Sequence, residues 1–138
     1  IMDYILGPIK EVHGIVSNQA NLYKADDIVT AEFLFESGVH GTGTWCFSAF
    51  EHMDRNEIIG SRGKLKFSTF GSEPIELTTE RGTEAFPVEN PQHIQQPLIQ
   101  TIVNELNGIN ICPSHGESAA RTSRVMDEIM REYRSKLK

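Results

Sequence analysis

Alternating apolar and polar positions dominate the first third of the chain. Residues 9–18 read IKEVHGIVSN, which predicts a strand, and the polar residues 19–26 predict a loop. The clearest alternation runs over residues 27–36, and after a break at residues 37–38 it resumes over residues 39–48. Because a two-residue break containing glycine is typical of a tight turn between antiparallel strands, this region is predicted to be a β-hairpin.

A two-residue turn at Ser37-Gly38 would place Glu36 opposite Val39, and this register assigns side chains to faces. One predicted face holds Ile28, Leu34, Trp45 and Phe47. The other holds Val29, Phe33, Phe35, His40 and Cys46. Both faces are partly apolar, whereas a sheet with one solvent-exposed face would carry mainly polar side chains on that face. We therefore expect helices on one face and a partner molecule on the other.

Further hairpins are predicted where short β-forming runs flank glycine turns. Residues 57–59 and 64–67 flank GSRG at 60–63, and residues 74–78 and 84–88 flank ERG at 80–82.

Two helices are predicted at the end of the chain. Pro97 is typical of a first helical turn, and Gly108 ends that segment. Ser114 and Glu117 have the spacing of a capping box ahead of a helix that reaches about Lys136. Its apolar stripe comprises Val125, Met126, Ile129, Met130, Tyr133 and Leu137. The predicted class is α+β: an open, mostly antiparallel β-sheet with helices packed on one face.

Composition limits the possible functions. The chain has 138 residues, which predicts a single domain over residues 1–138, and a formal net charge of −6, which argues against nucleic acid or an anionic membrane as a partner. No apolar run could span a membrane, and no signal peptide is recognisable. Cys46 and Cys112 are widely separated, as expected of thiols in a cytoplasmic protein. The apolar start at Ile1 favours a segment cut from a longer protein.

The familiar catalytic and cofactor motifs are missing. Residues 38–43 are rich in glycine but run from strand to strand, so they lack the helix that holds a pyrophosphate in a dinucleotide fold. They instead predict either close backbone approach or a β-bulge. Residues 60–63 are interpreted as a turn. His52, Asp54 and Glu57 lack the spacing of metal ligands on one element, and a solvated loop is the simpler interpretation. We predict no catalytic, cofactor-binding or metal-binding residue in this chain.

Two places suit a polyhydroxylated ligand. His93, Gln95 and Gln96 precede the first predicted helix, where backbone N–H groups are unpaired and where amide and imidazole groups could bind hydroxyls. The alternative is a loop that ends in a helix cap. Trp45 is the single tryptophan, and at a strand end it could either stack on a sugar or fill the core.

The order of several segments resembles the C-terminal domain of the glucose–fructose oxidoreductase/inositol dehydrogenase family (Gfo/Idh/MocA). The resemblance covers nearly the whole chain and rests on residues 3–12, 27–31, 35–39, 41–43, 57–65 and 114–120. It implies a fold like that of dihydrodipicolinate reductase. It also implies a parent enzyme whose N-terminal Rossmann domain binds NAD or NADP and whose substrate is a sugar, an inositol or a related hydroxy or oxo compound.

The same resemblance predicts which functions belong to this chain and which belong to the rest of the parent enzyme. The Rossmann domain and its Glu-Lys-Pro motif do not occur in this sequence, so the chain alone is expected to bind no cofactor and to be inactive. Its expected partners are the parent's Rossmann domain, a small-molecule substrate contacted by His93, Gln95, Gln96 and Trp45, and a second copy. The sheet face with Val29, Phe33, Phe35 and His40 is the predicted oligomer surface. The alternative is a stand-alone, non-catalytic binding or dimerisation module.

Overall fold

The computed structural model describes residues 1–136, which form two compact units. Unit 1 contains residues 1–50 and 112–136, and unit 2 contains residues 51–111. Each unit is described by itself below, and the assignment of one domain to the whole chain remains a prediction. Leu137, predicted to belong to the stripe of the last helix, lies outside the described residues.

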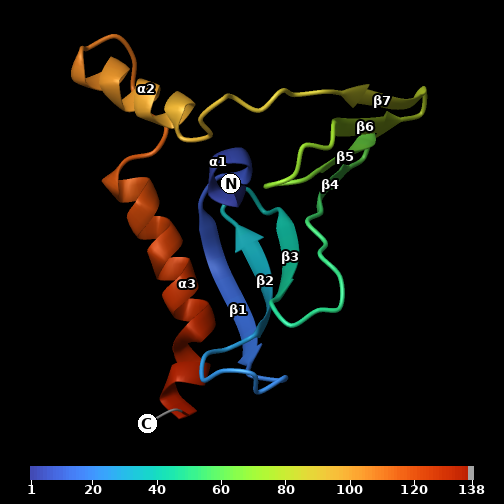
Figure 1. Cartoon of the computed structure of the whole chain (residues 1–138), viewed down its shortest axis with the longest axis vertical. Coiled ribbons are helices and arrows are strands. Elements are labelled where there is room, and N and C mark those ends of the chain that lie inside the picture. The colour runs from blue at the N-terminus through green and yellow to red at the C-terminus, as the bar shows by residue number, and fades with distance from the viewer. Residues whose placement is uncertain (137–138) are drawn as a thin grey trace. The chain divides into compact units, whose positions relative to one another are not determined.

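Unit 1 is a three-stranded antiparallel sheet with two helices. Its elements are α1 (Met2–Leu6), β1 (Ile9–Ser17), β2 (Ile28–Phe35), β3 (His40–Cys46) and α3 (Gly116–Lys136). The strand order is β1-β2-β3, so each strand pairs with its neighbour in sequence. The long helix α3 runs beside β1 (Figure 1). The predicted strands and the final helix are confirmed to within about two residues.

The core of unit 1 lies between one face of this sheet and the two helices. The buried residues of its cluster are Ile9, Ala31, Phe33 and Phe35. Met2 and Leu6 of α1 and Val125 and Ile129 of α3 pack against them. Burying these side chains removes apolar surface from water, which is the main favourable contribution to folding.

Arginines of α3 fasten that helix to the start of the chain. Arg121 donates to both carboxylate oxygens of Asp3, from Nε at 3.0 Å and from a terminal nitrogen at 2.8 Å. Arg124 donates to the carbonyl oxygen of Ile9 at 2.9 Å. The hydrogen bond from Arg121 holds the pKa of Asp3 below its usual value. At the N-terminus of α3, the N–H of His115 donates to Ser118 Oγ, one residue later than the predicted capping box.

The register of the β2–β3 hairpin differs from the prediction by one residue. Phe35 pairs with Val39 through a hydrogen bond of 2.9 Å, so three residues form the turn, and Gly38 has a φ of 82°. A three-residue turn with glycine in the left-handed region is a common alternative to the two-residue turn. Because the slip reverses the faces of β3, Trp45 joins Phe33 on the core face and His40 lies on the opposite, open face.

Unit 2 is a four-stranded antiparallel meander followed by a helix. Its elements are β4 (Asn56–Gly60), β5 (Gly63–Phe67), β6 (Ile75–Thr79), β7 (Gly82–Phe86) and α2 (Gln96–Leu106). The strand order is β4-β5-β6-β7. One face is charged, since Glu57 binds Arg55 at 2.7 Å and Lys64 at 3.2 Å. The other face carries Ile58, Leu65, Phe67, Ile75, Leu77 and Phe86.

The α+β class with antiparallel strands is confirmed, although the strands belong to two sheets rather than to one. The division falls at the segment between Cys46 and Asn56, where no strand continues the pairing. Within residues 1–136, no helix is both long enough and apolar enough to cross a membrane.

Candidate functional site

Trp45 forms a half-exposed aromatic surface on unit 1. It lies near the end of β3, and 42% of its surface is exposed. Its ring meets that of Phe33 edge to face, with centroids 6.4 Å apart and planes at 88°. This contact holds one edge of the indole against the core. The side chain of Trp45 therefore packs on the core and still presents aromatic surface to solvent, and its stacking on a sugar stays a prediction.

Two glycines of β3 make room for these aromatic rings. A Cβ at Gly43 would lie 2.5 Å from Cη2 of Trp45, so the indole lies directly over the backbone at this position. A Cβ at Gly41 would lie 3.4 Å from Cε2 of Phe35. The glycine-rich stretch thus serves close approach of side chains, as its strand-to-strand setting predicts.

The strand end that carries Trp45 is tied to a buried carboxylate. Asp27 is 1% exposed and accepts hydrogen bonds from the N–H groups of Gln19 at 2.6 Å and Ala20 at 2.7 Å. These hydrogen bonds lower the pKa of Asp27, and the bond from Gln19 has the largest effect. A further hydrogen bond from Ser48 also lowers this pKa. The N–H of Phe47 also donates to the Asp27 carbonyl oxygen at 2.8 Å. Asp27 therefore fixes both the loop before β2 and the residues just after Trp45.

Asp27 is not among the residues that the sequence predicts to be important. The signal was present, since an aspartate between a polar loop and a strand is well suited to accept hydrogen bonds from nearby backbone N–H groups.

The predicted polar segment lies in unit 2, at the start of α2. Gln95 is the N-cap residue of α2 but makes no side-chain capping bond, and Pro97 occupies the first turn as predicted. The N–H of Gln96 donates to the His93 carbonyl oxygen at 2.9 Å. His93, Gln95 and Gln96 are all exposed. The structure therefore places these three together on one turn, while Trp45 belongs to the other unit.

The open face of the three-stranded sheet is mainly polar. His13, Glu32 and Thr42 are successive cross-strand partners on β1, β2 and β3. The hydroxyls of Thr30 and Thr44 lie 3.3 Å apart on the same face. Of the four residues predicted to share an oligomer surface, only His40 is on this face. Phe33 and Phe35 are buried on the other face, which α1 and α3 cover, and the one-residue slip places His40 on the face opposite to them.

Among the described residues, no group of three or more His, Cys, Asp or Glu side chains is arranged so that it could hold a metal ion. Asp54 accepts hydrogen bonds from Ser68 Oγ at 2.5 Å and from the N–H of Phe70 at 2.6 Å, and these bonds lower its pKa. Glu57, the other carboxylate in the set compared with metal ligands, forms ion pairs with Arg55 and Lys64. These residues therefore serve as local structural links.

The architecture of residues 1–136 does not fit a nicotinamide dinucleotide. Such a cofactor is held where a parallel strand leads through a glycine-rich turn into a helix N-terminus. Every strand pair described here is antiparallel, and the glycine-rich residues 38–43 lead from β2 into β3. We therefore derive no step through a dinucleotide from the residues of this chain.

Comparison with known proteins identifies the family. Residues 1–66 match the family model described as the GFO/IDH/MocA C-terminal domain. Oxidoreductase P35 of Formosa agariphila is 38% identical over 99 residues, which are 72% of this chain and 30% of that relative. The chain belongs to the GFO/IDH/MocA family, and its residues 1–66 match the C-terminal domain of that family.

Solved structures show the same fold at low sequence identity. An oxidoreductase from Agrobacterium radiobacter, in complex with NAD+, L-tartaric acid and magnesium, matches with a TM-score of 0.75 and 15% identity. The alignment covers 93% of this chain and 43% of that one. Biliverdin reductase from Synechocystis, in complex with biliverdin and NADP+, matches with a TM-score of 0.72 and 15% identity, covering 94% and 42%. The chain thus spans less than half of these proteins and about a third of the curated relative.

Proposed function

We propose that this chain is the substrate-binding and oligomerisation domain of an NAD(P)-dependent oxidoreductase. The observation that carries this proposal is the 38% identity to Oxidoreductase P35, of which the chain matches only 30%. The structural relatives bound to NAD+ and NADP+ support a nicotinamide cofactor for the longer protein. Because the antiparallel strands offer no dinucleotide fold, the cofactor would be bound by a Rossmann domain outside these residues.

The substrate we propose is a sugar, an inositol or a related hydroxy or oxo compound. Hydride would pass between the nicotinamide and a carbon that bears a hydroxyl or carbonyl group. Two separate contacts are proposed, one in each unit. In unit 1 the exposed indole of Trp45 would stack on a ring face. In unit 2 the side chains of His93, Gln95 and Gln96 would bind hydroxyls. These are binding and orienting roles, and no residue of this chain is proposed as an acid, a base or a nucleophile.

The oligomer surface we propose is the open face of β1, β2 and β3. It carries His13, Glu32, His40 and Thr42, while α1 and α3 cover the other face. Ile15 adds an exposed apolar side chain to this surface. A two-fold pairing of such faces would be self-complementary, as in most homodimers.

The proposed function is tested with two proteins: this 138-residue chain and the product of the complete reading frame that encodes it. NAD+ and NADP+ binding is measured by calorimetry, and activity is followed as formation of reduced nicotinamide with a panel of polyols, inositols and aldoses. We expect the longer protein to bind one dinucleotide and to oxidise members of the panel, and the chain alone to do neither. Dinucleotide binding by the chain alone, or a longer protein that binds none, would contradict the proposal.

The stand-alone binding module is the second candidate, and the same experiment separates the two. A reading frame that encodes no further domain would favour the module. It would then direct ligand screening to Trp45 and the segment from His93 to Gln96.

A further inference from the structure

Two arginines occupy neighbouring turns at one end of the β4–β7 sheet. Arg62 lies in the turn between β4 and β5, and Arg81 lies in the turn between β6 and β7. Because Gly63 pairs with Thr79 across β5 and β6, both turns come to the same end of the sheet. A Cβ at Gly63 would lie 2.6 Å from the carbonyl oxygen of Thr78, so these strands approach closely where the turns begin.

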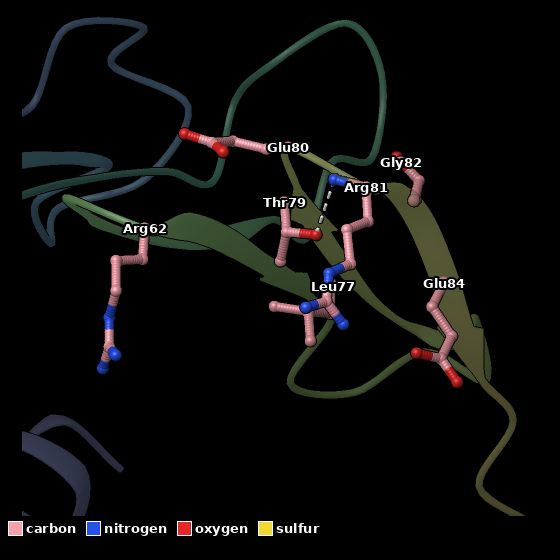
Figure 2. Close-up of a pocket in the computed structure, with 8 residues that line it drawn as sticks. Arg62, Leu77, Thr79, Glu80, Arg81, Gly82 and Glu84 are labelled. Atoms are coloured by element: carbon pink, nitrogen blue, oxygen red, sulfur yellow. Dashed lines mark hydrogen bonds between the residues drawn. The ribbon is translucent and has the colours of Figure 1, made fainter.

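A cavity of about 660 Å³ lies at this end of the sheet. Its lining comprises Arg62, Leu77, Thr79, Glu80, Arg81, Gly82, Thr83 and Glu84. Figure 2 shows the side chains of Arg62 and Arg81 extending to the same side of the two turns, with Leu77 beside Arg81, whereas the Glu80 side chain extends in a different direction. The turn that carries Arg81 is braced, since its N–H donates to Thr79 Oγ1 at 3.2 Å.

The two guanidinium groups are not neutralised by the protein. Neither Arg62 nor Arg81 forms an ion pair or a side-chain hydrogen bond among residues 1–136, although Glu80 and Glu84 are close in sequence to Arg81. The opposite face of the same sheet differs, because there Glu57 binds Arg55 and Lys64. Two positive charges that line one cavity and form no ion pair with a carboxylate are suited to bind an oxyanion.

We propose that this cavity is a binding site for a small organic oxyanion, with Arg62 and Arg81 as the two clamping groups. The anion can be a carboxylate or a phosphate, because the guanidinium fork matches both. Leu77 supplies apolar contact for the carbon frame of the ligand. Glu84, the cross-strand partner of Leu77, lines the same cavity and weakens anion binding through like charge. This site does not depend on the proposed oxidoreductase function.

The test is a titration of the isotope-labelled 138-residue chain with two probes, inorganic phosphate and succinate, followed by amide chemical shifts. We expect saturable shifts centred on Ser61–Gly63 and on Thr79–Gly82. Arg62→Gln and Arg81→Gln should each weaken binding about tenfold, as expected for loss of a charged hydrogen bond. Glu84→Gln should strengthen it. The matched control is Arg55→Gln, which makes the same charge change on the opposite face and should leave affinity unchanged.

The two probes distinguish the anion. Tighter phosphate binding indicates a phosphate ester, and tighter succinate binding indicates a carboxylic acid, and each result supports the site. Shifts that do not saturate for either probe would overturn the proposal. An equal loss of affinity in Arg55→Gln and Arg62→Gln would also overturn it, because binding would then reflect overall charge. Both turns are exposed, and an unchanged spectrum outside them verifies that each variant is folded.

Discussion

Gly14 of β1 lies directly against Ile129 of α3. A Cβ at position 14 would lie 2.7 Å from Cγ2 of Ile129 and 3.2 Å from its Cα. The second distance involves backbone, so rotation of a side chain cannot relieve it. This contact sets how closely the helix approaches the sheet, and it makes a glycine necessary at an otherwise ordinary strand position.

Replacing Gly14 with alanine should therefore destabilise the chain. Overpacking at a close contact lowers the free energy of unfolding by about 1–3 kcal/mol, whereas alanine is usually the better residue in a strand interior. Urea denaturation followed by circular dichroism measures the change. The control is Gly116→Ala, where a Cβ would have no neighbour within 4 Å. Equal stability of Gly14→Ala and the unsubstituted chain would show that α3 does not lie against β1 at this distance.

Gly43→Ala should displace the indole of Trp45, because the new methyl group would occupy the position of the ring. Trp45 is the only tryptophan, so intrinsic fluorescence reports on this side chain alone. We expect emission shifted to the red and stronger quenching by acrylamide. Gly41→Ala, whose Cβ would lie 3.4 Å from Phe35, should leave emission nearly unchanged. Identical spectra for the two variants would contradict the stacking of Trp45 over Gly43.

Asp27→Asn should reduce stability most at neutral pH. The folded-state pKa of Asp27 is lowered from 3.8, so its contribution is fully present above that value and is lost as pH falls through the folded pKa. We therefore expect the difference in denaturation midpoint between the parent chain and Asp27→Asn to shrink as pH falls below about 3.8. Asp26→Asn, which removes a charge one residue earlier, serves as the control. A difference independent of pH would show that the ionised carboxylate is not responsible.

In the full-length protein, Trp45→Ala should raise KM for the substrate, while Trp45→Phe, which keeps an aromatic surface, should have a smaller effect. His93→Ala should raise KM or lower kcat, because it removes a donor and acceptor from the proposed substrate side. Steady-state kinetics with the preferred substrate measures both. Kinetics unchanged by His93→Ala would remove this segment from the site, and equal effects of both Trp45 variants would argue against stacking.

The open face of unit 1 should control assembly. Ile15 is 78% exposed on this face, and Ile15→Lys would place a charge in the proposed interface. Sedimentation of the full-length protein should show at least a tenfold weaker association. The matched control is Ile59→Lys, because Ile59 is 75% exposed on the charged face of unit 2. Unchanged assembly in Ile15→Lys would place the interface elsewhere.

The sequence predicted the strands well because alternation is a local signal with a fixed period of two residues. It failed at the register, because Ser37-Gly38 is compatible with turns of two or three residues and one extra residue exchanges the faces of β3. The face shared by Phe33 and Trp45, and the separation of His40 from both, thus depended on the φ of Gly38. That angle belongs to the folded hairpin, and residue identity alone does not determine it.

The candidate sites were harder to predict than the strands. His93, Gln95 and Gln96 could be proposed from the sequence because they are close together in it, and the structure keeps them on one turn. Arg62 and Arg81 are separated along the chain and become neighbours only through the pairing of Gly63 with Thr79. The sequence predicts only a turn around each arginine, since nothing local to either one indicates the other.

Unit 1 is built from two segments that are far apart in the sequence and are therefore synthesised at different times. β1, β2 and β3 are synthesised before unit 2, but the helix that covers their apolar face, α3, begins only at Gly116, after all of unit 2. Until then Phe33 and Phe35 lack the cover that Val125 and Ile129 provide. The hairpins of unit 2 involve only neighbouring strands and can form during this interval. During synthesis, the first sheet therefore leaves its apolar face uncovered for the length of unit 2, and apolar surface exposed in this way favours aggregation.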